Sequence, residues 1–162
     1  MVSTSQEDWK EVVVEWRGGS AFLGQTPGGG EVQIGAFGDK PGASPMELLL
    51  LGLAGCTGID VAGILLKKRQ PLADLKVEVR GKRRESHPRV YTEIEVVYLL
   101  WGDGLDPGAV EQAIRLSEEK YCSASAMLGQ VAEIHSSFRL FPDPEPDRTR
   151  RNADGADETA WR

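Results

Sequence analysis

The sequence predicts an α+β protein with the element order β-β-β-α-β-β-α-α-β, in which the first helix is long. Three observations indicate this class. Short segments rich in β-formers lie between glycine-rich turns, a long apolar segment carries a helix start signal, and two segments of alternating polarity follow it. Because strands and helices do not alternate strictly along the chain, the strands should pair mostly with their sequence neighbours.

The N-terminal part predicts three short antiparallel strands near residues 10–17, 20–25 and 30–36. β-branched and aromatic residues fill these segments, and Gly-Gly, Thr-Pro-Gly-Gly-Gly and Gly-Asp-Lys-Pro-Gly punctuate them as turns. Ahead of them, residues 1–11 contain no basic segment followed by an apolar one, which is not the pattern of a secretory signal. We therefore expect a cytoplasmic protein.

A long helix is expected between Ser44 and Gln70. Residues 44–47, Ser-Pro-Met-Glu, combine an N-cap serine, a proline at the first helical position and a glutamate that closes a capping box. Pro71 stops the helix, and the basic residues 67–69 favour the negative end of its dipole. The segment is apolar on every side, which predicts a buried central helix.

The same apolar segment also meets the length and flank rules for a membrane span. Residues 48–66 contain a single charged side chain, and a Lys-Lys-Arg cluster follows them. That charged residue is Asp60, which would be costly near the centre of a bilayer. The amphipathic strands on either side also need an apolar cover. The buried helix is therefore favoured, and no membrane association is expected.

Five further elements follow the long helix. They are strands within residues 72–86 and 89–102, a helix opening at Asp106-Pro107, a short helix within 123–131 and a last strand within 132–141. Leu75, Val77 and Val79 alternate with polar residues, as in a half-buried strand. Ser123 is the expected N-cap of the short helix.

Composition excludes several function classes. The chain of 162 residues has 19 Lys+Arg against 25 Asp+Glu, for a formal net charge of −6, which argues against general nucleic-acid binding. His87 and His135 have no cysteine at zinc-ligand spacing, so no metal site is expected. Residues 142–162 are dense in charge and proline, which predicts a disordered tail after a single domain at residues 1–141.

The two cysteines are the candidate reactive groups of the chain. A lone buried cysteine is most often a small apolar core residue, and this interpretation stays open for Cys56. Cys122 stands at an expected break between two helices, where backbone N–H groups favour the ionisation of a thiol. Arg17, at an expected strand end, is a positive charge that would stabilise a thiolate if the fold brings the two together.

Glu47 and several glycines share the expected helix with Cys56. The capping box is a sufficient structural reason for Glu47. On an ideal helix Glu47 lies almost opposite Cys56 and about 13 Å away along the axis, so it should not touch the thiol of its own chain. Gly52, Cys56 and Gly63 share one face, which is narrow enough for another element or another chain to approach closely.

Three segments carry a family resemblance. They are SPMELLLLGLAGCTGIDVAGILLKKRQ, RRESHPRVYTEIEVVYLL and AIRLSEEKYCSASAML, and they lie in the expected order along the chain. Together they resemble the OsmC/Ohr family of thiol-dependent hydroperoxide reductases, in particular its YhfA-like branch, over roughly residues 9–140. The resemblance implies an OsmC-like fold and an intertwined homodimer, with the two long helices packed together and the active sites at the interface.

The resemblance also implies a peroxidase that reduces organic hydroperoxides to alcohols in oxidative-stress defence. Cys56 matches the peroxidatic cysteine, Cys122 the resolving cysteine that forms a disulfide with it, and Glu47 the acidic residue at the helix start. Arg17 is a weaker match to the thiolate-stabilising arginine. No bound cofactor is implied, because a small dithiol or a lipoyl- or thioredoxin-like protein acts as the external reductant. A redox sensor and a non-catalytic ligand-binding dimer stay open as alternatives.

Overall fold

The computed structural model describes residues 9–142, which form two compact units. The first unit ends at Leu49 and the second begins at Leu50, so the boundary falls inside the long helix α1 (Pro45–Lys67). The predicted tail lies outside the described residues, apart from Pro142. The extent of the predicted single domain stays a prediction.

The first unit contains an antiparallel sheet of three short strands. β1 (Val13–Gly18), β2 (Ala21–Gln25) and β3 (Glu31–Ile34) pair in the order β1-β2-β3, so the three predicted strands are confirmed. Gly18 and Gly19 turn the chain between β1 and β2 with φ angles of 106° and 55°, a region that glycine enters at little cost. A small antiparallel pair that the sequence did not predict follows, formed by β4 (Ala36–Phe37) and β5 (Lys40–Pro41).

Helix α1 begins with the predicted capping box. The backbone N–H of Glu47 donates to Ser44 Oγ at 3.2 Å, and the backbone N–H of Ser44 donates to the Glu47 carboxylate at 2.7 Å. These reciprocal bonds satisfy two backbone donors that the first turn of a helix leaves without an intrahelical acceptor. The helix ends at Lys67, just before Arg69 adopts a left-handed φ of 56°.

One face of α1 is buried and another is exposed. Its buried residues recur every fourth position and are Leu53, Thr57, Val61 and Leu65. Leu51, Ile59 and Leu66 are 60%, 54% and 50% exposed, so within the single chain the predicted central helix is buried along one face only. The physical reason is that the second unit covers only the face that lies on its sheet.

The composition of α1 does not decide between a core helix and a membrane span. By length and composition alone the helix is long and apolar enough to cross a membrane, with a mean hydropathy of 2.0 over its most apolar 18 residues. Only 22% of that window is buried. The core helix of a water-soluble protein passes the same criterion, and the expectation of no membrane association stays a prediction.

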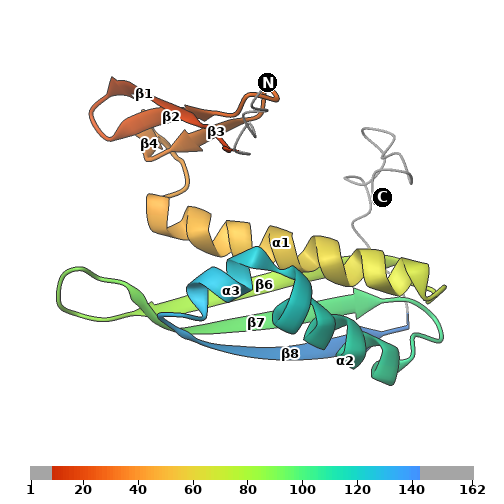
Figure 1. Ribbon diagram of the computed structural model, residues 1–162. Helices are drawn as coiled ribbons and strands as arrows, with labels where there is room; N and C mark the ends of the chain where they lie inside the picture. Colours follow the sequence, from red (N-terminus) through yellow and green to blue (C-terminus); the bar gives the residue numbers. More distant parts are fainter. Residues whose placement is uncertain (1–8, 143–162) are drawn as a thin grey trace, which may run out of the picture. The chain divides into compact units, whose positions relative to one another are not determined.

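The second unit is built on a mixed sheet of three long strands. β6 (Asp74–Arg83) pairs with β7 (Tyr91–Trp101) in antiparallel fashion, and β7 pairs with β8 (Glu133–Phe141) in parallel. The buried positions of central β7 alternate and include Ile94, Val96, Tyr98 and Leu100. Figure 1 shows the helices lying over one face of this sheet. The alternation thus places one row of apolar side chains under the helices.

Two helices carry the chain from β7 back to β8, which is why these strands run parallel. Helix α2 (Pro107–Leu116) begins at Asp106, whose carboxylate accepts from Gly108 N–H at 3.1 Å. It passes directly into a π-helical turn, η1 (Ser117–Tyr121), closed by a 2.7 Å bond from Cys122 N–H to the Ser117 carbonyl. Helix α3 (Ser123–Leu128) follows. The predicted fold class and the break between the two helices are confirmed.

The prediction that Ser123 caps α3 is wrong by one residue. Cys122 has the extended conformation of an N-cap, with φ −76° and ψ 101°, and its sulfur accepts from Ser125 N–H at 3.3 Å. Ser123 already belongs to the helix. The π turn ends at Tyr121, so Cys122 is the single residue between it and α3 and takes the cap position.

Candidate active site

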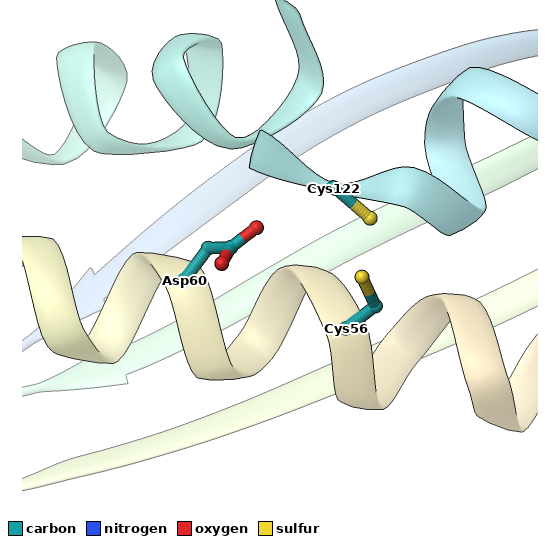
Figure 2. A group of neighbouring side chains, drawn as sticks. All are labelled: Cys56, Asp60 and Cys122. Carbon is teal, nitrogen blue, oxygen red and sulfur yellow. The ribbon is translucent and has the colours of Figure 1, made fainter. Parts of the chain in front are cut away.

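Three side chains converge between α1 and the start of α3. Cys56 and Asp60 lie one turn apart on α1, and Cys122 faces them from the η1–α3 junction (Figure 2). The two sulfur atoms and a carboxylate oxygen of Asp60 all lie within 4.8 Å of one another. The spacing of four residues puts Cys56 and Asp60 on the same helical face, and the π turn aligns Cys122 with them.

The two thiols differ in their exposure. Both cysteines are free; Cys56 is half-buried, whereas Cys122 is only 3% exposed. On α1, Cys56 lies at the border between the buried row that contains Leu53 and the exposed row that contains Ile59. A molecule arriving from solvent therefore meets the sulfur of Cys56 before that of Cys122.

Burial also affects the pKa of the Cys122 thiol. The loss of solvent raises the pKa of the Cys122 thiol, and the nearby thiol of Cys56 raises it further. Hydrogen bonds from Ser125 favour the thiolate and oppose this rise, but burial is the larger cause. Cys122 therefore holds its proton to a higher pH than an ordinary cysteine.

A buried chain of hydroxyl groups ends at Asp60. Ser117 Oγ donates to Asp60 Oδ2 at 2.9 Å, Thr57 Oγ1 lies 2.9 Å from Ser117 Oγ, and Tyr98 Oη lies 2.5 Å from Thr57 Oγ1. A hydroxyl group has one proton to donate. Because Ser117 gives its proton to the carboxylate, Thr57 must donate to Ser117 and Tyr98 must donate to Thr57. The four residues thus form one directed hydrogen-bond chain.

Tyr98 is the neutral end of this chain. Burial is the main cause that raises the pKa of Tyr98 to about 12, and it outweighs the opposing effect of the hydrogen bond between Tyr98 and Thr57. The phenol therefore stays protonated and remains a donor throughout the physiological pH range. A permanent donor at one end and a carboxylate at the other hold Thr57 and Ser117 in fixed rotamers.

Glu47 and Arg17 belong to the first unit, whereas Cys56, Asp60 and Cys122 belong to the second. The carboxylate of Glu47 serves the capping box, and the hydrogen bonds from Ser44 hold the pKa of Glu47 below its usual range. Arg17 Nη2 lies 2.5 Å from a carboxylate oxygen of Glu15 in the same strand. The structure thus brings together Cys56 and Cys122, and the catalytic roles predicted for Glu47 and Arg17 stay predictions.

Sequence reasoning missed the hydroxyl chain and gave Asp60 no role at the site. The signal for Asp60 was present, because it follows Cys56 by four residues and is the only charged residue within the apolar segment. Ser117 and Tyr98 had no comparable signal, because only the packing of η1 and β7 against α1 brings them to Thr57.

Known proteins are similar to this chain in sequence. The family model described as OsmC-like protein matches residues 37–137. Protein YhfA of Escherichia coli K12 is 40% identical over 128 residues, which are 78% of this chain and 95% of that protein.

Solved structures are similar to this chain in fold. A hypothetical protein from Aquifex aeolicus VF5 is 40% identical, with a TM-score of 0.75 over 85% of this chain and 99% of that one. The organic hydroperoxide resistance protein OhrB of Bacillus subtilis is 17% identical, with a TM-score of 0.56 over 81% and 98% of the two chains. The OhrB likeness shows a shared fold.

Proposed function

The chain belongs to the OsmC-like protein family, and from this premise we propose that it is a thiol-dependent peroxidase that reduces organic hydroperoxides to alcohols. The observation that carries the proposal is the pair of free thiols of unequal exposure, with sulfur atoms within 4.8 Å. The description of the Bacillus subtilis protein of the same fold as an organic hydroperoxide resistance protein supports the reaction class.

The first step of the proposed reaction uses the more exposed thiol. The thiolate of Cys56 attacks the terminal oxygen of the hydroperoxide, so that an S–O bond forms while the O–O bond breaks. The departing alkoxide takes up a proton and leaves as the alcohol. Cys56 is oxidised to a sulfenic acid, and the peroxide is reduced.

The second step uses the buried thiol. The sulfur of Cys122 attacks the Cys56 sulfur, an S–S bond forms, the S–O bond breaks, and the departing hydroxide takes up a proton to become water. In sum, two thiols and one hydroperoxide give one disulfide, one alcohol and one water. An external dithiol, small or carried by a lipoyl- or thioredoxin-like protein, then reduces the disulfide by thiol exchange.

Asp60 is the proposed proton carrier of the second step. Its carboxylate lies close to both sulfur atoms, so it can accept the Cys122 proton and return it to the departing hydroxide. The hydrogen bond from Ser117 keeps the carboxylate oriented during the transfer. Asp60 thus joins Cys56 and Cys122 as a group close to the reacting atoms in the proposed mechanism.

The surroundings of Cys56 favour an organic peroxide over hydrogen peroxide. Gly52 lies one turn before Cys56 on α1, and a Cβ added at Gly52 would meet no described atom within 4 Å apart from its chain neighbours and the backbone of its own helix. An alkyl group can therefore lie on apolar surface beside the sulfur. A cytoplasmic location suits this chemistry, because cellular dithiols there return the pair to its reduced state.

A homodimer is part of the proposal. The exposed row of α1 contains Leu51, Ile59 and Leu66, and nothing among the described residues comes within 4 Å of a Cβ added at Gly55. Apolar side chains around a glycine allow close helix contact, so a second copy of α1 is the proposed cover. In such a dimer Glu47 would serve the thiol site of the neighbouring chain, and Arg17 is the weaker proposed partner of the thiolate.

Turnover of the purified full chain tests the function. We expect consumption of tert-butyl hydroperoxide with dithiothreitol or a reduced lipoyl protein, and slower consumption of hydrogen peroxide. Cys56→Ser should abolish turnover, whereas Ser123→Ala, beside the resolving cysteine, should retain it. Turnover by Cys56→Ser would refute the assignment. A disulfide that forms without turnover would support the redox sensor instead, and two unreactive thiols would support the ligand-binding dimer.

A further inference from the structure

The two thiols and the carboxylate that meet at this site are also potential metal ligands. Cys56, Asp60 and Cys122 form the only group of three or more potential Cys, His, Asp or Glu ligands at metal-binding distances within the part of the chain that the structure describes. Two of the three donors lie one helical turn apart on α1, and the third comes from the η1–α3 junction. A helix thus supplies two ligands from one face and a distant segment supplies the third.

The distances suit a small tetrahedral cation. Zn²⁺ binds thiolate sulfur at about 2.3 Å and carboxylate oxygen at about 2.0–2.2 Å, so tetrahedral ligand atoms lie roughly 3.5–3.8 Å apart. The three donor atoms lie within 4.8 Å of one another, and small side-chain rotations close the difference. A fourth position is then open to a water molecule, because Cys56 and Asp60 are only half-buried.

Hydrogen bonds from Ser117 and Ser125 also orient two of the potential ligands. Ser117 Oγ donates to Asp60 Oδ2, and no hydrogen bond to the other carboxylate oxygen, Oδ1, is present among the described residues. Ser125 N–H donates to the sulfur of Cys122, which holds that sulfur toward α1. Hydrogen bonds of this kind to the ligands of a metal fix their geometry and raise its affinity.

We propose that the reduced chain binds one Zn²⁺ through Cys56, Asp60 and Cys122. Binding replaces the protons of the two thiols, which pass to solvent, by two Zn–S bonds. The bound ion masks both sulfur atoms, and the oxidised pair offers no thiolate to hold the ion. Zinc occupancy and disulfide formation are thus mutually exclusive states of one site.

This site was not visible in the sequence, which has no zinc-ligand spacing. Zinc patterns are recognised by two ligands close together at each of two places in the chain. Here one place supplies a cysteine and an aspartate on a helix, and the other supplies a single cysteine. Zinc motifs defined by cysteine and histidine spacing do not include an aspartate, so these three ligands are recognised only in the folded structure.

Titration of the reduced full chain with Co²⁺, followed by displacement with Zn²⁺, tests the proposal without any peroxide. We expect a sulfur-to-cobalt charge-transfer band that saturates at one ion per chain and disappears when Zn²⁺ is added. Cys56→Ser and Cys122→Ser should each weaken Zn²⁺ binding by more than the roughly 10- to 100-fold that loss of an outer-shell partner costs. Ser117→Ala, which leaves all three ligands in place, should weaken it within that range.

Asp60→Asn is compared with Asp103→Asn, an exposed aspartate outside the site. The first should weaken Zn²⁺ binding and change the cobalt spectrum, and the second should leave both unaltered. The absence of a charge-transfer band in the reduced protein, or an undiminished band in either cysteine variant with a normal unfolding transition, would overturn the proposal. Zinc binding by a chain without peroxidase activity would support the site and refute only the proposed function.

Discussion

Ser117 donates its hydroxyl proton to the carboxylate of Asp60 across 2.9 Å, and this bond links the π turn to α1. It also sets the direction of the other two hydrogen bonds that link Ser117, Thr57 and Tyr98. Thr57 is left to donate to Ser117, and Tyr98 to Thr57. A single carboxylate thereby orders three buried hydroxyl groups that come from three different elements.

Replacing Thr57 by valine should destabilise the protein. The change removes the hydrogen bonds that Thr57 makes with the Tyr98 hydroxyl and with the Ser117 oxygen, and both groups are in buried positions. We expect a loss of about 1–3 kcal/mol in the free energy of unfolding, measured by urea denaturation. Thr92→Val removes an exposed hydroxyl and should change this free energy by less than about 0.5 kcal/mol. Equal losses in the two variants would contradict the directed chain.

Replacing Asp60 by asparagine should slow the resolving step. The amide oxygen still accepts from Ser117, but the group can no longer take a proton from Cys122. We expect disulfide formation after one equivalent of hydroperoxide to slow by roughly 10²- to 10⁴-fold, which is the usual contribution of a positioned base. Rapid quenching and mass spectrometry measure the rate, with Asp103→Asn as the control. An unchanged rate in Asp60→Asn would remove the carboxylate from the mechanism.

Tyr98 should make stability fall in strong alkali. Its pKa in the folded state is raised to about 12 by burial, above that of an unfolded tyrosine. Its contribution is therefore complete below the unfolded pKa and is lost as the pH rises toward 12. An ultraviolet titration should show the ionisation of Tyr98 as a late step near pH 12. Tyr98→Phe should lose this step and Tyr121→Phe should retain it; late absorbance of unchanged size in Tyr98→Phe would refute the assignment.

The capping box should give α1 a stability that depends on acid pH. Hydrogen bonds from Ser44 lower the pKa of Glu47 below its unfolded value. The contribution of Glu47 is thus present above the unfolded pKa and is lost as the pH falls through the folded pKa. Thermal unfolding should show Glu47→Gln less stable than wild type at neutral pH, with the difference vanishing in acid. Glu85→Gln, in the β6–β7 turn, should behave as wild type at both pH values, and a constant deficit in Glu47→Gln would argue against the cap.

A charge on the exposed row of α1 should dissociate the proposed homodimer. Ile59→Glu would bury a carboxylate against the second copy of α1, a change that an apolar helix contact does not tolerate. Light scattering of the purified protein should then report the mass of one chain. Val131→Glu places the same charge on a similarly exposed apolar residue outside α1 and should leave the dimer intact. A dimer that survives Ile59→Glu would place its interface elsewhere.

The fold was largely predictable because its signals are local. The capping box at Ser44 and Glu47 and the alternation in β6 need only neighbouring residues to act. The exposed row of α1 was not predictable, since apolar composition does not reveal which surface covers it. The cap of α3 was misplaced by one residue, because the sequence does not show that a π turn extends α2 as far as Tyr121.

The candidate site was only partly predictable. The pairing of Cys56 with Cys122 came from a family resemblance and not from spacing, because the two residues meet only when α1 and η1 pack on the same sheet. Asp60 was recognised as a cost to a membrane span and as lying four residues after Cys56, but it was given no role at the site. The positions of Ser117 and Tyr98 depend on long-range packing and had no local signal.

The sulfur of Cys122 as the cap of α3 exposes a trade-off between stability and activity. Serine, threonine, aspartate and asparagine are the preferred residues at this position, and a thiol is a weaker acceptor than their oxygen atoms. A serine at position 122 would accept the Ser125 N–H more strongly and hold the start of the helix better. At this position, the sulfur atom that the proposed redox chemistry requires is also a weaker helix cap than an oxygen atom would be.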